Sequence, residues 1–249
     1  MAYFRAILVS ALFAGVLAGA ALTGLQTLKV YPLILAAEEF ENKGHDHAVH
    51  APSNPNPSSS TSSSPSFNSG QDKDTGTWMP ADGGERLFYS LLSNVLIGVG
   101  LGLVLAAMFA LRDVTDWRQG VAWGLGGFIA VSLAPALGLP PELPGMAAGD
   151  LLARQTWWFA TALLTAGGMA LIFLSDGPIW RVSGVVVAAL PHIYGAPHPA
   201  TLDSNVPAIL AAEFATASLA SNLIFWVILG ALAAETMARL DRAGNSEFG

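Results

Sequence analysis

The run AILVSALFAGVLAGAALTGLQTL, Ala6–Leu28, contains no charged residue and decides the fold class. A stretch of about 20 apolar residues is long enough for one α-helix to cross the hydrocarbon core of a bilayer. A secretory signal peptide is the alternative, but its apolar core is only about 7–15 residues long. We therefore expect an uncleaved transmembrane helix whose apolar pattern continues to Ala37, with a kink near Pro32.

Five more apolar segments follow, and the chain as a whole is 53% hydrophobic and 12% charged, which is typical of an integral membrane protein. The later segments are Leu87–Leu111, Val121–Leu139, Thr156–Leu174, Ile179–Leu190 and Ile209–Ala234. The fifth segment of the chain, Ile179–Leu190, is shorter than the roughly 17–25 residues that a span needs. The sequence thus predicts an all-α, polytopic membrane helix bundle of about six hydrophobic segments, with five full spans and a short, broken fifth segment.

A polar region separates the first two spans. Within it, Ala51–Thr77 is rich in serine and proline and has almost no large apolar side chain. Such a composition cannot bury enough surface to fold, so we predict a long disordered loop. The predicted parts of the chain are a first transmembrane helix at 1–37, an extracytoplasmic loop at 38–86, a helical bundle at 87–240 and a tail at 241–249.

The residue types exclude several classes of protein. The formal net charge is -7 and the 11 basic residues form no patch, so no nucleic-acid partner is expected. The absence of cysteine excludes disulfides and thiolate metal sites. No GxxxxGK[ST], HExxH or GxSxG motif occurs, and we predict neither an enzyme nor a bound cofactor.

The distribution of arginines indicates an orientation. If all six segments cross and the N-terminus is cytoplasmic, every short cytoplasmic loop carries arginine. The cytoplasmic arginines are then Arg5, Arg112, Arg118, Arg181, Arg239 and Arg242. In this topology all five histidines of the chain face the extracytoplasmic side.

The stretch PHIYGAPHP, Pro191–Pro199, is the first candidate metal site. Proline lacks a backbone donor and its ring clashes with the preceding turn, so Pro191 should end the helix and leave His192 and His198 on irregular backbone. Neutral imidazole is the commonest metal ligand. Glu213 lies in an apolar helix, where a carboxylate is costly unless it is paired or functional, and we expect it to complete the site. A capped helix end with hydrogen-bonded imidazoles is the alternative.

A second group of imidazoles occurs in HDHAVH, just before the serine-rich stretch. His45, His47 and His50, with Asp46 beside them, offer nitrogen and oxygen ligands for loose, exchangeable capture of a divalent cation. The alternative is a solvated polar loop.

Other polar and small residues carry weaker signals. Asn94 and Asn222 could offer amide oxygens within the bundle, although interhelical hydrogen bonding is the more usual role. Glu142 in GLPPELPG could join an outer cation path, and RQTWW, Arg154–Trp158, predicts an interfacial aromatic belt with its arginine at the headgroups. Small-residue spacings predict close helix packing at Gly15 and Gly19, Gly98 and Gly102, and Gly120 and Gly124.

Taken together, several motifs resemble the CbtA family of predicted cobalt transporter subunits. In chain order they are GLPPELPG, RQTWW, PHIYGAPHP and VPAILAAEFATASLASNLIFWVILG, after a first span that runs into PLILAAEE. The resemblance covers most of the membrane portion. It implies a multi-pass protein of the bacterial inner membrane that works in cobalt uptake for cobalamin biosynthesis, beside a small single-span, histidine-bearing partner called CbtB. The residues it points to are His192, His198, Glu213 and the GLPPELPG loop.

The sequence therefore predicts a membrane subunit of a divalent metal uptake system, with Co²⁺ as the expected substrate. The ligand types would also accept Ni²⁺, Cu²⁺ or Zn²⁺. A non-transporting scaffold or metal-sensing subunit that acts through a partner is the alternative, and a homo-oligomer is left open. A metal-dependent hydrolase using the same ligands lacks any recognisable signature for water activation.

Overall fold

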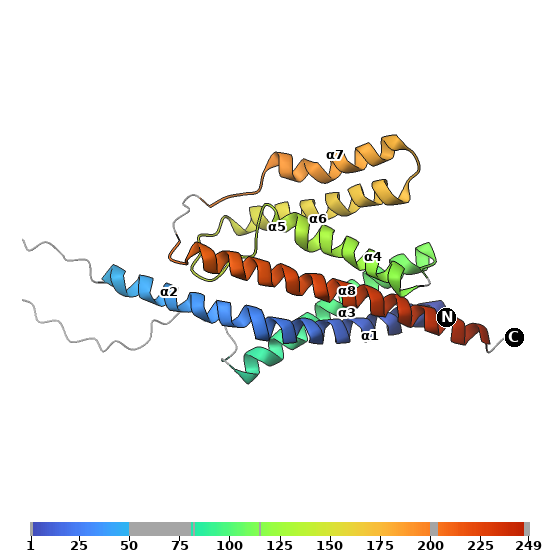
Figure 1. Ribbon diagram of the computed structural model, residues 1–249, viewed down its shortest axis with the longest axis horizontal. Coiled ribbons are helices and arrows are strands. Elements are labelled where there is room, and N and C mark those ends of the chain that lie inside the picture. Colours follow the sequence, from blue (N-terminus) through green and yellow to red (C-terminus); the bar gives the residue numbers. More distant parts are fainter. Residues whose placement is uncertain (1, 50–80, 82, 115, 200–203, 247–249) are drawn as a thin grey trace, which may run out of the picture.

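The computed structural model describes residues 2–49, 81, 83–114, 116–199 and 204–246, and these residues form a helical bundle without strands (Figure 1). The elements are α1 (Ala2–Leu25), η1 (Gln26–Val30), α2 (Tyr31–Val49), α3 (Gly84–Arg112), α4 (Trp117–Phe128), η2 (Ile129–Leu133), α5 (Ala134–Ala136), α6 (Leu151–Leu174), α7 (Pro178–Tyr194) and α8 (Ala208–Ser246). The elements η1 and η2 are π-helical.

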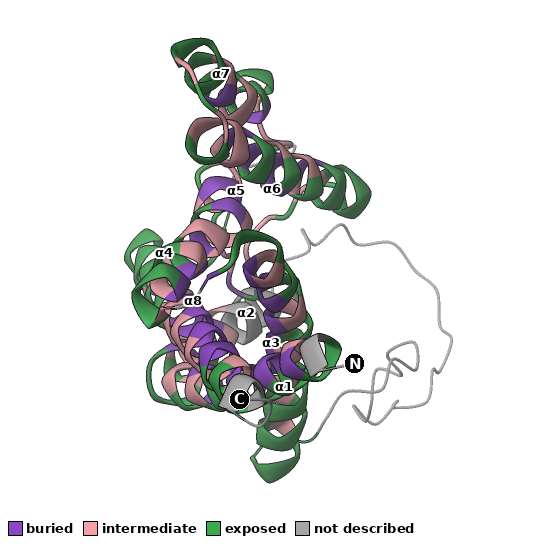
Figure 2. Cartoon of the chain, turned by 90° about the vertical axis from the view of Figure 1, so that its right-hand side faces the viewer, coloured by how far each residue is buried: buried purple, intermediate pink, exposed green. Residues whose placement is uncertain are grey.

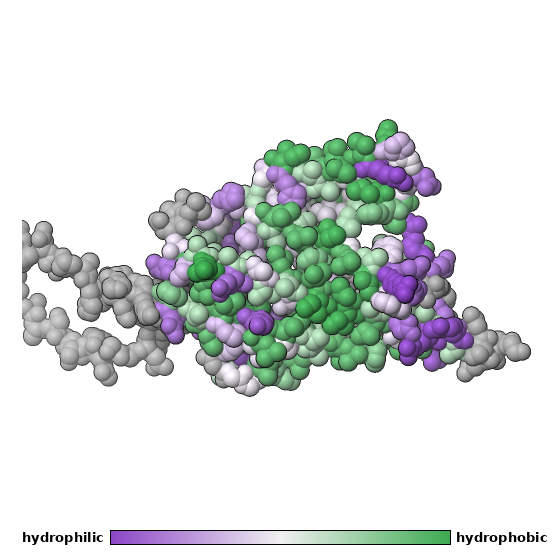
Figure 3. Space-filling view, viewed as in Figure 1, coloured by the Kyte–Doolittle hydropathy of each residue, from purple (hydrophilic) through white to green (hydrophobic). Residues whose placement is uncertain are grey.

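Among the described residues, five helices are long and apolar enough to cross a membrane. They are Phe4–Phe40, Gly84–Arg112, Trp117–Ala136, Leu151–Leu174 and Ala208–Ala243. Figure 3 shows hydrophobic side chains across the middle of the molecule and hydrophilic ones toward its ends, as a membrane span requires. The predicted all-α membrane bundle is confirmed.

The first span is one continuous helical rod formed by α1, η1 and α2 (Figure 1). The irregularity expected near Pro32 takes the form of the π-helical turn η1, which ends two residues before that proline. The helix also continues beyond Ala37 to Val49, because glutamate, alanine and lysine are good helix formers. Residues 38–49 of the predicted loop are thus helical, whereas its serine-rich stretch lies outside the described residues.

Glycines hold the main helix pairs together at very short range. A Cβ added to Gly98 on α3 would lie 2.5 Å from the carbonyl oxygen of Gly15 on α1. On the other side of the bundle, a Cβ on Gly230 of α8 would lie 3.0 Å from Cα of Gly124 on α4. The predicted close packing is confirmed, and it replaces the hydrophobic drive that helices lack in lipid.

The core lies between α1, α3, α4 and α8, where the buried residues gather (Figure 2). Its largest members include Phe109, Phe225, Trp226, Leu229 and Met237. The α6–α7 pair stands to one side of this core and is joined to it mainly through η2 and α5 (Figure 2). Within the pair, Gly168 and Gly184 let the two backbones meet.

The prediction that Pro191 ends its helix is wrong. Pro191 is buried inside α7, which has 17 residues and continues to Tyr194. The proline lies in the last turn, so its missing N–H removes only one bond near the helix end. The helix stops instead at Gly195, whose φ of 92° is a glycine conformation and whose N–H donates to the carbonyl oxygen of Pro191 at 3.0 Å. The fifth segment is short, as predicted, but it is not broken at Leu190.

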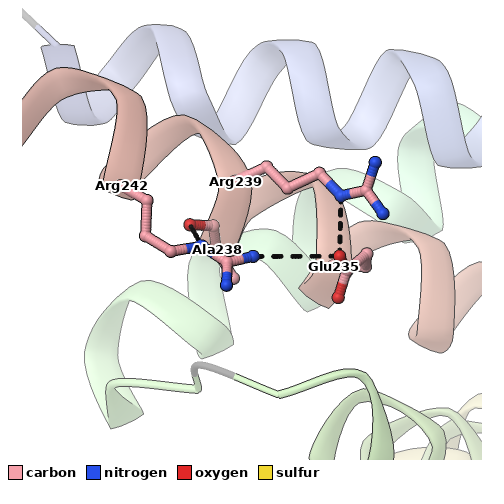
Figure 4. A network of polar contacts seen from close by, with 4 residues as sticks. All are labelled: Glu235, Ala238, Arg239 and Arg242. Carbon is pink, nitrogen blue, oxygen red and sulfur yellow. Dashed lines mark hydrogen bonds and ion pairs between the residues drawn. The ribbon is translucent and has the colours of Figure 1, made fainter. Parts of the chain in front are cut away.

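The end of the bundle opposite PHIYGAPHP carries the arginines expected on the cytoplasmic side. The helix bounds give the positions of three of them: α3 ends at Arg112, α4 begins next to Arg118 and α7 begins near Arg181. On α8, Glu235 accepts a hydrogen bond from Arg239 at 2.6 Å and lies 3.8 Å from Arg242 (Figure 4). The side chain of Arg242 also donates to the carbonyl oxygen of Ala238 at 3.1 Å. These arginines therefore share one end of the molecule.

Candidate metal-path site

Three motifs that are far apart in the sequence meet at the other end of the bundle. A Cβ on Gly149 would lie 3.4 Å from the carbonyl carbon of His198, and one on Gly138 would lie 2.9 Å from the Cβ of Ala196. The loop after α5 therefore runs against the PHIYGAPHP backbone. RQTWW joins them, because Trp157 donates a hydrogen bond from Nε1 to the carbonyl oxygen of Pro191 at 3.2 Å.

The same loop also contacts the beginning of α8. Leu143 of GLPPELPG is buried in a small cluster with Val206 and Phe214. The cluster includes Val30 and Ala37 from the first span. Glu213 precedes Phe214, so the loop brings the chain around Glu213 to the same end of the molecule as the two histidines.

The predicted ligands do not converge on one point in the described part of the chain. His192, His198 and Glu213 are all exposed, and no group of three or more histidine or carboxylate residues that could hold a metal occurs among the described residues. His192 instead makes an edge contact with the Trp157 ring, with centroids 5.9 Å apart. The metal role of these residues remains a prediction.

The HDHAVH group lies on the far end of α2. The backbone at His45 and His47 is helical, whereas the sequence favoured a loop. His50 lies outside the described residues. In Figure 1 this part of α2 projects past the ends of the neighbouring helices. Its metal role is likewise a prediction.

A partly open cavity of about 740 Å³ lies between the α6 side of the molecule and the α1–α3 side. We call it the central cavity. It extends from Pro140 and Glu142 in the loop to Leu101 and Phe225 within the bundle. Its polar lining residues are Gln26, Asn94, Ser132, Glu142, Arg154, Gln155 and Asn222.

Both π-helical turns contribute to this cavity. The first, η1, supplies Gln26, and the second, η2, supplies Ser132. A π-helical turn inside an α-helix is rare and frequently occurs at a functional site. Neither Gln26 nor Ser132 is among the predicted site residues, although Ser132 is an isolated polar residue in an apolar segment and could have been found by that signal.

A hydrogen-bond network fixes the amide of Asn94 in the wall of the central cavity. Its Nδ2 donates to Thr23 Oγ1 at 3.0 Å and to Gln26 Oε1 at 2.7 Å. The Thr23 hydroxyl donates to the carbonyl oxygen of Gly19 at 3.0 Å, so Thr23 can only accept from Asn94. The amide therefore presents its nitrogen to α1 and η1.

The other polar groups of the cavity are held within or between helices. Asn222 Nδ2 donates to the carbonyl oxygen of Ser218 one turn earlier, at 3.0 Å. Ser132 Oγ accepts from Trp226 Nε1 at 3.3 Å. Asn94 thus has the expected interhelical role, whereas Asn222 is bonded within its own helix.

The part of the cavity lined by the GLPPELPG loop carries an ion pair. Arg154 Nη2 lies 2.5 Å from Glu142 Oε2, and both side chains are about three-quarters buried. The sequence placed Arg154 at lipid headgroups and Trp157 in an interfacial belt. The expectation for Trp157 is wrong, because the GLPPELPG loop folds back over the start of α6 and helps to bury that side chain. Arg154 pairs with Glu142 of the same loop, and its position at the headgroups stays a prediction.

These features define the class: a polytopic membrane protein whose helix bundle has a partly open cavity, lined mainly by apolar residues and by the seven polar ones named above. A family model described as "Probable cobalt transporter subunit (CbtA)" matches residues 4–238 of the chain. The chain belongs to this CbtA family, which confirms the resemblance seen in its motifs. A search of curated proteins and a search of solved structures found no match.

Proposed function

We propose that this chain is the membrane subunit of an uptake system for a divalent transition metal, with Co²⁺ as the substrate. It collects the cation on the extracytoplasmic side through histidine and carboxylate ligands and passes it inward, without acting as an enzyme. The observation that carries the proposal is the contact of PHIYGAPHP with the loop after α5, because the same loop also lines the central cavity through Pro140 and Glu142. Family membership supports cobalt as the metal.

The direction of transport follows from the orientation of the chain. Arginines lie at the helix ends opposite PHIYGAPHP, and arginine is enriched in cytoplasmic loops. This supports a bacterial inner-membrane protein with a cytoplasmic N-terminus and outward-facing histidines. A cation that enters from the histidine end would then move toward the cytoplasm.

The two histidine groups have different roles in this proposal. His45, His47 and His50 collect cations in this proposal, and the first two lie at the far end of α2, away from the bundle (Figure 1). His192, His198 and Glu213 then receive the cation near the loop after α5. Because these three side chains are exposed and apart in the isolated chain, a partner completes the ligand set. We propose the small, single-span CbtB-like subunit for this role.

The test is accumulation of radiolabelled cobalt in cells that lack other cobalt importers and that express the chain with its partner. A double variant, His192→Ala with His198→Ala, is expected to lose uptake while its amount in the membrane stays unchanged. Tyr194→Ala is the matched control, because Tyr194 is equally exposed in the same segment and is a poor ligand for Co²⁺. Normal uptake by the double variant would refute the assigned site.

A further inference from the structure

We propose that the amide oxygens of Asn94 and Asn222 form a transit site for a hydrated divalent cation inside the central cavity. The site lies between α3 and α8, on the membrane side of the Glu142–Arg154 pair. This inference rests on the proposed function and adds the route by which the cation crosses the bundle.

The first argument is the unpartnered oxygen of Asn94. The residue is only 9% exposed, and its nitrogen is held by Thr23 and Gln26. Among the described residues, no donor is within hydrogen-bonding distance of its Oδ1. The residue lines the central cavity, so this oxygen can accept hydrogen bonds from metal-bound water there or contact a cation directly.

The second argument is the matching arrangement of Asn222. Its nitrogen is also occupied, by the carbonyl oxygen of Ser218, and its Oδ1 has no donor among the residues that the structure describes. The residue is half-buried and lines the same cavity as Asn94. Two helices therefore present amide oxygens, rather than amide nitrogens, to one cavity.

Amide oxygens suit a passing cation. They coordinate divalent cations directly and also accept hydrogen bonds from metal-bound water. Within the cavity lining the one carboxylate is Glu142, in the GLPPELPG loop, where Arg154 neutralises it. The deeper ligands are therefore neutral and bind weakly, and conduction requires a site that the ion can leave as well as enter. An anionic substrate would instead be repelled by two carbonyl oxygens.

Asn222 gives the cleaner test, because its hydrogen bond stays within α8 whereas Asn94 links two helices. We expect Asn222→Leu to lower the rate of radiolabelled cobalt uptake about tenfold, while the protein purified with its partner still binds cobalt at the outer ligands. The matched control is Thr216→Val, which removes a polar group bonded to the same helix outside the cavity, and it should leave uptake unchanged.

A second variant keeps the test decisive if leucine disturbs folding. Asn222→Asp keeps the size of the side chain and adds a charge, so it is expected to retain cobalt longer in binding measurements and to slow uptake. Wild-type uptake together with normal uptake in both Asn222 variants would overturn this inference and leave the proposed function intact. Absence of wild-type uptake, from protein that is in the membrane, would instead refute the proposed function.

Discussion

Replacing Gly98 by alanine should separate the first span from α3. The added Cβ would lie 2.5 Å from the carbonyl oxygen of Gly15 and 3.2 Å from its carbonyl carbon. Both neighbours are backbone atoms of a continuous helix, so no flexible side chain can move aside. The two helices must therefore move apart as units.

The size of the movement follows from these distances. A carbon bearing hydrogen normally contacts a carbonyl oxygen at about 3.3–3.6 Å, so the helices must separate by roughly 0.8 Å. The same shift would lengthen the Asn94–Thr23 hydrogen bond from 3.0 Å to about 3.8 Å, beyond the range of such bonds. Overpacking of this kind costs about 1–3 kcal/mol.

The assay is unfolding of the purified protein in detergent, with Gly100→Ala as the matched control. Gly100 lies on the same helix, and a Cβ there meets no atom within 4 Å. We expect a free energy of unfolding about 1–3 kcal/mol lower for Gly98→Ala, and an unchanged or slightly higher value for Gly100→Ala because alanine favours helix. Equal stability of the two variants would refute the proposed contact between Gly98 and Gly15.

Two further predictions concern the outer end of the bundle. Trp157→Phe keeps a large ring but removes the hydrogen bond to Pro191, so it should lower the free energy of unfolding by about 1 kcal/mol; an unchanged thermal midpoint would contradict the role of that bond. Glu142→Gln removes the carboxylate that lines the cavity and should raise the cobalt concentration for half-maximal uptake about fivefold. Arg154→Gln should shift that concentration the other way by freeing Glu142, and a shift in the same direction for both variants would contradict competition between Arg154 and the cation.

The sequence alone was sufficient for the bundle, because long uncharged runs leave few alternatives to membrane helices. The transmembrane helix at Ala6–Leu28 could be predicted from the length of that run and its lack of charge alone. The glycine contacts were also predictable, since Gly98 and Gly102 recur at helical spacing and small residues favour close approach in lipid.

The local predictions that failed did so because tertiary contacts outweighed local preferences. The α7 helix tolerates Pro191 because the proline lies in its last turn, where Trp157, more than thirty residues earlier, packs on that turn and donates a hydrogen bond to the Pro191 carbonyl oxygen. Trp157 is buried, and is not part of an interfacial belt, because the GLPPELPG loop packs against it. Neither contact can be read from spacing, since both depend on how the loop after α5 returns to α6.

The central cavity could not be predicted from the sequence, because it too depends on tertiary contacts. Asn94 was noted as a candidate, but its orientation depends on where the Thr23 hydroxyl and the Gln26 amide lie across the helix interface. The π-helical turns that bring Gln26 and Ser132 to the cavity have no local signature in the sequence. Only the three-dimensional packing shows whether an asparagine amide links two helices or also exposes its oxygen to a cavity.

The most direct test of the central claim is cobalt flux into liposomes that contain the purified chain, with and without the single-span partner, and a cobalt-sensitive dye inside. We expect cobalt to enter liposomes that hold the chain and its partner faster than it enters protein-free liposomes, and we expect Asn222→Leu to slow this entry. Cobalt binding without flux under either condition would contradict transport and would identify the chain as a membrane scaffold or metal-sensing subunit.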